Sequence, residues 1–342
     1  MLAPLALLAA CDLPTDLPHW DTTWVVPGKG ASFPVAQLLP SGVRAMPDGS
    51  AFQLDIAPTT FSTSLGEMCG SACPPVNGAV VPKPAFTATL GSSLALPAGV
   101  ASATVVGGTV VVNATNGFSF DPLRPGGGAF GTMTLTVSAG GAVLASTTVD
   151  GATTPFPAGS TLSRTLPLAS AAVTGAMSVR LVLTSPAGGL ATMNTSDRLT
   201  VSASAQGVRL GDARVDVGGR PVSVPPVALE LDGLDDMVVE RVHGGALVLG
   251  ITNPFGGATG AMTLRITAPG VAPITKHVEL RTGTTTERVE LTQAELRSIL
   301  GQPGVVLAAT GTLSSASPVL VTPTQTVTIT TKLELVLGAK EQ

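Results

Sequence analysis

Apolar and polar residues alternate one by one along much of the chain beyond residue 50. In residues 132–137, Met133, Leu135 and Val137 fall on one face and three threonines fall on the other. A period of two is typical of a strand with one buried face. Residues 261–266 repeat the pattern, and shorter strand signals occur at residues 52–56, 110–112, 179–183, 199–202, 213–217, 247–251, 305–309 and 327–337.

Two short segments predict something other than a plain strand. Residues 293–300 predict a helix, because Thr292 and Glu295 form a capping box and Gly301 follows the last turn. Gly218 and Gly219 separate residues 215–217 from residues 221–224, which is the arrangement of a two-residue hairpin turn.

The strand pattern is duplicated within the chain. Residues 107–118 align without gaps to residues 244–255, and the following strand aligns residues 131–135 to residues 260–264. Near the ends of the copies, residues 199–202 match residues 327–330, so three blocks recur in the same order. The first copy has additional residues within 121–128, which we expect to form a surface loop. Similarity between unrelated strands rich in Val, Thr and Gly is the alternative explanation.

Each copy has the length and strand rhythm of an immunoglobulin-like sandwich. We therefore expect an all-β protein with two tandem immunoglobulin- or fibronectin-like β-sandwich domains, at residues 51–211 and 212–342. Residues 11–50, with several prolines, are expected to form an extended tether, and residues 1–10 a signal peptide.

A short element of the second copy resembles a known family. The run Thr252-Asn253-Pro254-Phe255 after an apolar strand is similar to the Asn-Pro signature of the late-embryogenesis-abundant type-2, or water-hypersensitivity, domain. The resemblance implies a fibronectin-like sandwich of similar size. The first copy departs from the signature, because Gly117 occupies the proline position. In physical terms, an Asn before a Pro is expected to end the strand.

The N-terminus resembles that of bacterial lipoproteins. An apolar run of ten residues ends at Leu8-Ala9-Ala10-Cys11, which is similar to a lipobox. The resemblance implies cleavage before Cys11 and lipidation of that residue, which would attach the mature chain to a membrane. No Lys or Arg precedes the apolar run, and a start codon farther upstream would explain this departure.

The remaining cysteines, Cys69 and Cys73, form an even pair in the sequence CGSAC. Outside the cytosol we expect them to form a local disulfide. Free thiols and a metal site are the alternatives, although zinc prefers four ligands and no histidine is nearby.

Charge and titratable residues give little sign of chemistry. Only 12% of residues are charged, the net charge is −4 and no basic cluster occurs, so we expect no nucleic-acid partner. His19, His243 and His277 have no metal or triad spacing around them. Asp232, Asp235 and Asp236 form the densest carboxylate group and are a weak candidate Ca²⁺ site, with a solvated turn as the alternative.

These observations predict a lipid-anchored protein of the bacterial cell envelope, on the periplasmic or outer-membrane face, with a structural or protein-interaction role. We expect no catalysis and no cofactor, and we expect the partners to be the membrane, through Cys11, and other envelope proteins. The alternative function is a ligand-binding or adhesive module that uses loops between strands, such as residues 121–128.

Overall fold

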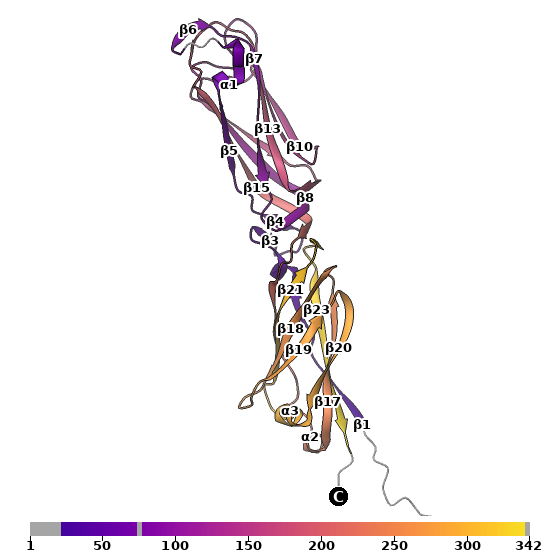
Figure 1. The fold of residues 1–342 in the computed structure, drawn as a ribbon. Helices are drawn as coiled ribbons and strands as arrows, with labels where there is room; N and C mark the ends of the chain where they lie inside the picture. Colours follow the sequence, from indigo (N-terminus) through magenta and orange to yellow (C-terminus); the bar gives the residue numbers. More distant parts are fainter. Residues whose placement is uncertain (1–21, 74–76, 339–342) are drawn as a thin grey trace, which may run out of the picture.

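The computed structural model describes residues 22–73 and 77–338, which form an elongated rod of two β-sandwiches arranged end to end (Figure 1). The described chain begins and ends at the same end of the rod, where Thr22 lies opposite Leu337. We call the sandwich at this end the proximal sandwich and the other the distal sandwich. The all-β fold class predicted from the alternation is confirmed.

The proximal sandwich packs a five-stranded sheet against a four-stranded sheet. The first sheet has the order β1-β23-β17-β20, with β2 also paired to β23, and the second has the order β16-β21-β18-β19. Two short helices, α2 (Asp236–Arg241) and α3 (Gln293–Ile299), lie at the proximal end (Figure 1). The strands are β1 (Thr22–Pro27), β2 (Ala31–Pro34), β16 (Arg220–Ala228), β17 (Val242–Asn253), β18 (Ala258–Thr267), β19 (Ile274–Leu280), β20 (Gly283–Thr292), β21 (Val306–Ser315) and β23 (Thr326–Leu337).

The distal sandwich has the same two layers and additional elements. Its larger sheet has the order β11-β8-β15-β4-β3, with β5, β12 and β22 paired along its flanks, and it faces a sheet of order β10-β9-β13-β7. β6 and β14 form a separate two-stranded ribbon. The elements are β3 (Val43–Ala45), β4 (Phe52–Leu54), β5 (Thr59–Ser64), α1 (Leu65–Cys69), η2 (Gly70–Ala72), β6 (Ala79–Pro82), β7 (Phe86–Ala95), β8 (Val100–Asn116), β9 (Thr132–Ala139), β10 (Ala142–Asp150), β11 (Thr161–Pro167), β12 (Ala171–Thr174), β13 (Ala176–Ser185), β14 (Leu190–Met193), β15 (Arg198–Val215) and β22 (Val319–Val321).

The two sandwiches share strand order and register, as a duplication requires. The order β11-β8-β15 has its counterpart in β20-β17-β23, and β10-β9-β13-β7 in β19-β18-β21-β16. Thr115 lies opposite Thr200, and the corresponding Thr252 lies opposite Thr328. The apolar positions aligned from the sequence are all buried: Val110, Val112, Met133, Leu135 and Val137 in one copy, and Leu247, Leu249, Met262, Leu264 and Ile266 in the other. A one-residue slip would expose every one of these side chains.

The tether predicted for residues 11–50 is wrong over β1 and β2, because both strands pair with β23 at the opposite end of the sequence. The predicted boundary at residues 211 and 212 is also wrong, because β15 continues to Val215 within the distal sheet. The proximal sandwich is therefore built from two segments, and the distal sandwich is inserted after its first strands. Residues 1–21, which include the predicted signal peptide and Cys11, lie outside the described residues.

Two smaller features were predicted with different success. The helix at residues 293–300 is confirmed as α3, which has the expected capping box between Thr292 and Glu295. The hairpin at Gly218 and Gly219 is wrong, because β15 pairs with β8 and β22 while β16 pairs with β21. Gly219, with a φ of +64°, instead turns the chain from one sandwich into the other.

Candidate functional site

The asparagines aligned from the two copies are structural. Asn116 and Asn253 are each fully buried at the end of a strand. The Oδ1 atom of Asn253 accepts a bond from the Phe255 amide (3.1 Å), and its Nδ2 donates to the Ala258 carbonyl (2.9 Å). Asn116 makes the equivalent bond to the Phe118 amide and donates to two carbonyls. Each side chain thus closes its own loop and is buried away from solvent, where it does not reach a ligand.

The departure of the first copy from the Asn-Pro signature has a physical cause. The Gly117 amide donates to the Arg198 carbonyl (2.9 Å), a bond that proline cannot make. A Cβ at Gly117 would also lie 2.4 Å from that carbonyl oxygen. The turn at the strand end therefore accepts proline in the proximal copy, at position 254, and excludes it in the distal copy, at position 117.

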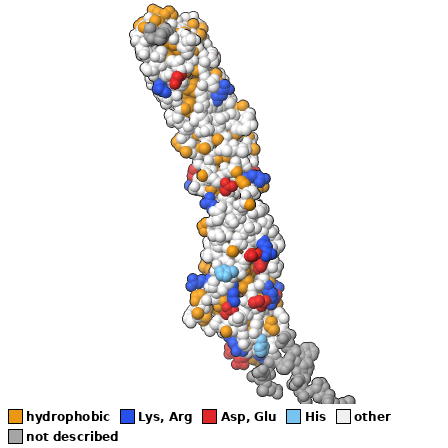
Figure 2. Space-filling model, in the orientation of Figure 1, with side chains coloured by type: hydrophobic (Ala, Val, Ile, Leu, Met, Phe, Trp, Pro, Cys, Tyr) orange, Lys and Arg blue, Asp and Glu red, His pale blue; other side chains and the backbone are white. Residues whose placement is uncertain are grey.

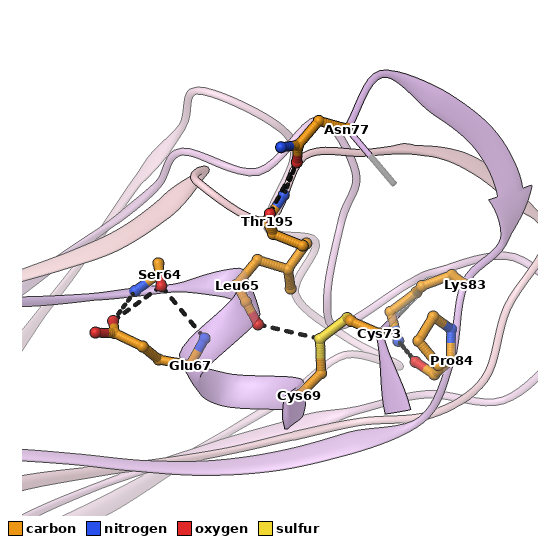
Figure 3. The surroundings of a disulfide bond; sticks show 9 residues. All are labelled: Ser64, Leu65, Glu67, Cys69, Cys73, Asn77, Lys83, Pro84 and Thr195. Atoms are coloured by element: carbon orange, nitrogen blue, oxygen red, sulfur yellow. Dashed lines mark hydrogen bonds between the residues drawn. A yellow bond between two sulfur atoms is a disulfide. The ribbon is translucent and has the colours of Figure 1, made fainter. Parts of the chain in front are cut away.

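The far end of the distal sandwich, which we call the tip, contains the disulfide of the structure. Cys69 and Cys73 are joined there, with 5.5 Å between their Cα atoms, and both are buried (Figure 3). The disulfide follows α1, whose start is fixed by a capping box between Ser64 and Glu67. This helix was not predicted, although Ser64-x-x-Glu67 carries the same capping-box signal as α3. The disulfide therefore belongs to a compact tip element that the proximal copy lacks.

The ribbon of β6 and β14 presents an apolar face to solvent at the tip. Val80 and Leu190 are 62% and 73% exposed, and Pro82, opposite Leu190, is exposed too. The other face of the ribbon packs on the core through Val81 and Met193. The ribbon contains no charged residue, so its surface suits an uncharged partner better than a charged one.

Lys83, directly after β6, is a buried cation at the tip. Its side chain is only 2% exposed, and its Nζ donates to the carbonyls of Pro84 (2.9 Å) and Pro186. The amine also lies 4.8 Å and 5.6 Å from the ring centroids of Phe86 and Phe120. Burial lowers the pKa of Lys83 from 10.5 to about 8. Only the flanking prolines, Pro82 and Pro84, mark this lysine in the sequence.

The loop at residues 121–128, which the alternative function would use, is tied to the body of the distal sandwich. Asp121 accepts bonds from the amides of Leu123 (2.8 Å), Arg124 (2.9 Å) and Phe156 (2.7 Å). Arg124 in turn donates to the carbonyls of Gly151 and Ala152. The polar side chains that could contact a ligand there are already used for internal bonds.

One open hollow lies on the outer face of the proximal four-stranded sheet. It has a volume of about 530 Å³ and is open to solvent. Its lining combines small and hydroxyl side chains with one arginine: Thr263, Arg265, Pro273, Thr275, Ala308, Ala309 and Thr310. It contains no pair of acid and base groups, so it offers a shallow contact surface and no constellation for catalysis.

The candidate Ca²⁺ site is not supported. The Asp235 carboxylate caps α2 by accepting from the Met237 amide (2.9 Å). In the part of the chain that the structure describes, no three His, Cys, Asp or Glu side chains converge as metal ligands, so Asp232, Asp235 and Asp236 do not form a cluster. His277 contacts the Thr263 hydroxyl (3.3 Å) on the sheet surface.

Charge is distributed unevenly along the rod. Figure 2 shows charged side chains gathered on the proximal half and sparse toward the tip. Among the described residues, no helix is both long enough and apolar enough to cross a membrane.

Comparisons with known proteins add little to this picture. No protein-family model and no curated protein matches the sequence. A protein of Parabacteroides distasonis ATCC 8503 for which secretion is inferred is 11% identical, with a TM-score of 0.35 over 92% of this chain and 99% of that chain. The CBM22-1–CBM22-2 tandem domain of Paenibacillus barcinonensis Xyn10C is 11% identical, with a TM-score of 0.19 over 90% of this chain and 98% of that chain. The fold assignment therefore depends on the strand pairing described above.

Proposed function

We propose that the protein is a lipid-anchored stalk of the bacterial cell envelope that holds a non-catalytic, uncharged contact surface away from the membrane. The observation that carries the proposal is the direction of the chain along the rod. The described chain enters at the proximal end, eleven residues after the lipobox Cys11, while the tip elements peculiar to the distal copy lie at the opposite end (Figure 1).

The dimensions of the rod support a stalk. A strand rises about 3.3 Å per residue, so β8, with 17 residues, spans about 56 Å and β17, with 12 residues, about 40 Å. End to end, the two sandwiches place the tip about 100 Å from the proximal end. The segment between Cys11 and Thr22 can reach at most about 40 Å even when fully extended. The proximal sandwich would therefore remain near the lipid, with the tip far from it.

The junction between the sandwiches supports a stiff connection. β22, from the C-terminal part of the chain, pairs with the end of β15 in the distal sheet. A second chain crossing, from β2 to β3, is held against the proximal sandwich by Gln37. Its Nε2 donates to the Ser223 carbonyl of β16 (3.0 Å), and its Oε1 accepts from the Ser223 amide (2.7 Å). Because these contacts come from separate segments, bending at one chain crossing would break contacts at another.

Fluorescence energy transfer from a tip or proximal label to an acceptor at the membrane surface tests the proposal. The lipidated protein would be reconstituted in phosphatidylcholine vesicles with a headgroup-level acceptor and labelled at Leu190→Cys or, as the matched control, at Met237→Cys in α2. Both positions are exposed, at 73% and 56%. We expect efficient transfer from position 237 and almost none from position 190. Equal transfer from both positions, or vesicle binding by a Cys11→Ser variant, would contradict the proposal.

A further inference from the structure

The last three strands of the two copies correspond residue by residue. Leu181 of β13 and Ala309 of β21 hold equivalent places opposite the aligned strands β9 and β18. Thr200 of β15 and Thr328 of β23 hold equivalent places opposite β8 and β17. The offset between equivalent residues of the two copies is 128 residues at both places (309 − 181 and 328 − 200). Neither copy therefore has a net insertion between these two strands. β14, which lies between them in the distal copy, is therefore the counterpart of β22.

Local structure agrees with this equivalence. After β14, the Asp197 amide donates to the Asn194 carbonyl, and after β22 the Gln325 amide donates to the Thr322 carbonyl, in the equivalent turn. The last residue of each strand is buried and the one before it is exposed: Met193 and Thr192 in β14, Val321 and Leu320 in β22.

β14 and β22 also pair with equivalent segments. β22 pairs with residues 213–215 at the end of β15, and β14 pairs with residues 79–81 of β6. Leu90 of β7 and Val224 of β16 are equivalent, because they lie opposite Leu181 and Ala309, and they are 134 residues apart. Residues 79–81 and 213–215 are also 134 residues apart, so the two segments precede β7 and β16 by the same interval. The equivalent pairs are Ala191–Val81 and Val319–Val215, Thr192–Val80 and Leu320–Arg214, and Met193–Ala79 and Val321–Ala213.

The same edge is thus closed in two different ways. At the junction, the strand paired with β22 is the end of an 18-residue strand that belongs to a whole neighbouring sandwich. At the tip, the strand paired with β14 is the four-residue β6, which is bonded to no other strand of the described residues. A two-stranded pair this short is weak by itself. The edge that holds two sandwiches together at the junction is therefore closed at the tip by a short segment.

We propose that β14 is a strand-docking edge that β6 closes within one molecule, and that the occupant it accepts from outside is the β6 strand of a second copy. The junction is the precedent, because the equivalent edge there binds an antiparallel strand. The second copy fits because β6 already has the register and the apolar, uncharged side chains that this edge pairs with.

Complementation between two variants tests the proposal. In the first variant, Val80→Pro with Val81→Pro breaks β6 and leaves the β14 edge open, because proline cannot donate to a ladder. In the second, Ala191→Pro with Thr192→Pro breaks the edge and releases an intact β6. We expect the wild type and each variant alone to sediment as monomers, and an equimolar mixture of the variants to double in mass.

Circular dichroism and the unfolding midpoint would show that each variant is folded. A double variant that does not fold is replaced by the single substitution Val80→Pro or Thr192→Pro. A labelled peptide of residues 78–84 gives a second readout, with binding expected to the first variant and none to the wild type. A mixture of folded variants that stays monomeric, or a variant that dimerises alone, would overturn the proposal.

Discussion

The distal and proximal sandwiches are two versions of one fold, kept together in a single chain, and they differ at their surfaces and ends. Their cores hold the same strands in the same register. Six of the seven ion pairs among the described residues lie within the proximal sandwich, including the half-buried pair of Lys276 and Glu295 at 2.9 Å. The comparison shows that the buried apolar positions specify this fold, since charge pairing was free to diverge.

The ends diverge for a different reason. In the proximal copy, the chain between β2 and β16 contains an entire sandwich, whereas in the distal copy the chain between β5 and β7 contains α1, the disulfide and β6. In the proximal copy this connection joins the two sandwiches, and in the distal copy it forms the tip of the rod. The duplication thus supplies one position that serves as a joint in one copy and as a tip in the other.

The largest expected effect breaks the shared core. Met133→Asp and Met262→Asp place an unpaired carboxylate at equivalent positions that are at most 1% exposed. We expect each to cost several kcal/mol and to unfold its own sandwich, because a buried charge without a partner is strongly unfavourable. Hydrogen exchange resolved by segment would measure this. Loss of protection in the distal strands alone for one variant and in the proximal strands alone for the other would show two independent cores.

A second change sharpens the difference at the strand ends. Gly117→Pro removes the bond to the Arg198 carbonyl and introduces a clash, so we expect about 3 kcal/mol of destabilisation. The reciprocal Pro254→Gly should cost about 1 kcal/mol or less, through unfolded-state entropy. Urea unfolding of both variants measures the pair. Equal costs would show that the two turns are interchangeable.

The alternation of apolar residues was enough to predict the fold class, the duplication and the shared core, because each signal is local to one strand. The role of β1 and β2 was not predictable in this way. Residues 22–27 form a strand only because β23, about three hundred residues later, offers an edge, and the prolines around them favoured a tether. The buried position of Lys83 depends on carbonyls and rings from distant segments. Composition gave no sign of these contacts.

A third prediction concerns pH and affects the tip alone. The lowered pKa of Lys83 means that, between about pH 8 and 10.5, the folded distal sandwich binds fewer protons than the unfolded chain. Its stability should therefore rise with pH across this window, by about 3 kcal/mol at most. Lys83→Met, which keeps the apolar stem, should remove the rise. Denaturant unfolding at pH 7.5 and 10 measures it, and a wild type whose stability does not rise would contradict the assignment.

A smaller and more local effect than that of Lys83 is expected at the disulfide. Cys69 and Cys73 close a loop only four residues apart, so replacing both with Ser should cost about 1–2 kcal/mol. The loss should be confined to the distal sandwich, because the disulfide lies at the tip. The unfolding temperature and the hydrogen-exchange protection of α1 would check this. An equal loss of protection in the proximal strands would contradict it.

Small-angle X-ray scattering of the mature chain, with Cys11→Ser to prevent lipidation, tests the central claim most directly. Two sandwiches end to end, coupled through β15 and β22, predict a maximum dimension of about 100 Å or slightly more, and a single narrow population of shapes. A compact particle of about half that length, or a broad mixture of bent forms, would contradict the account of a stiff stalk built from two copies of one fold.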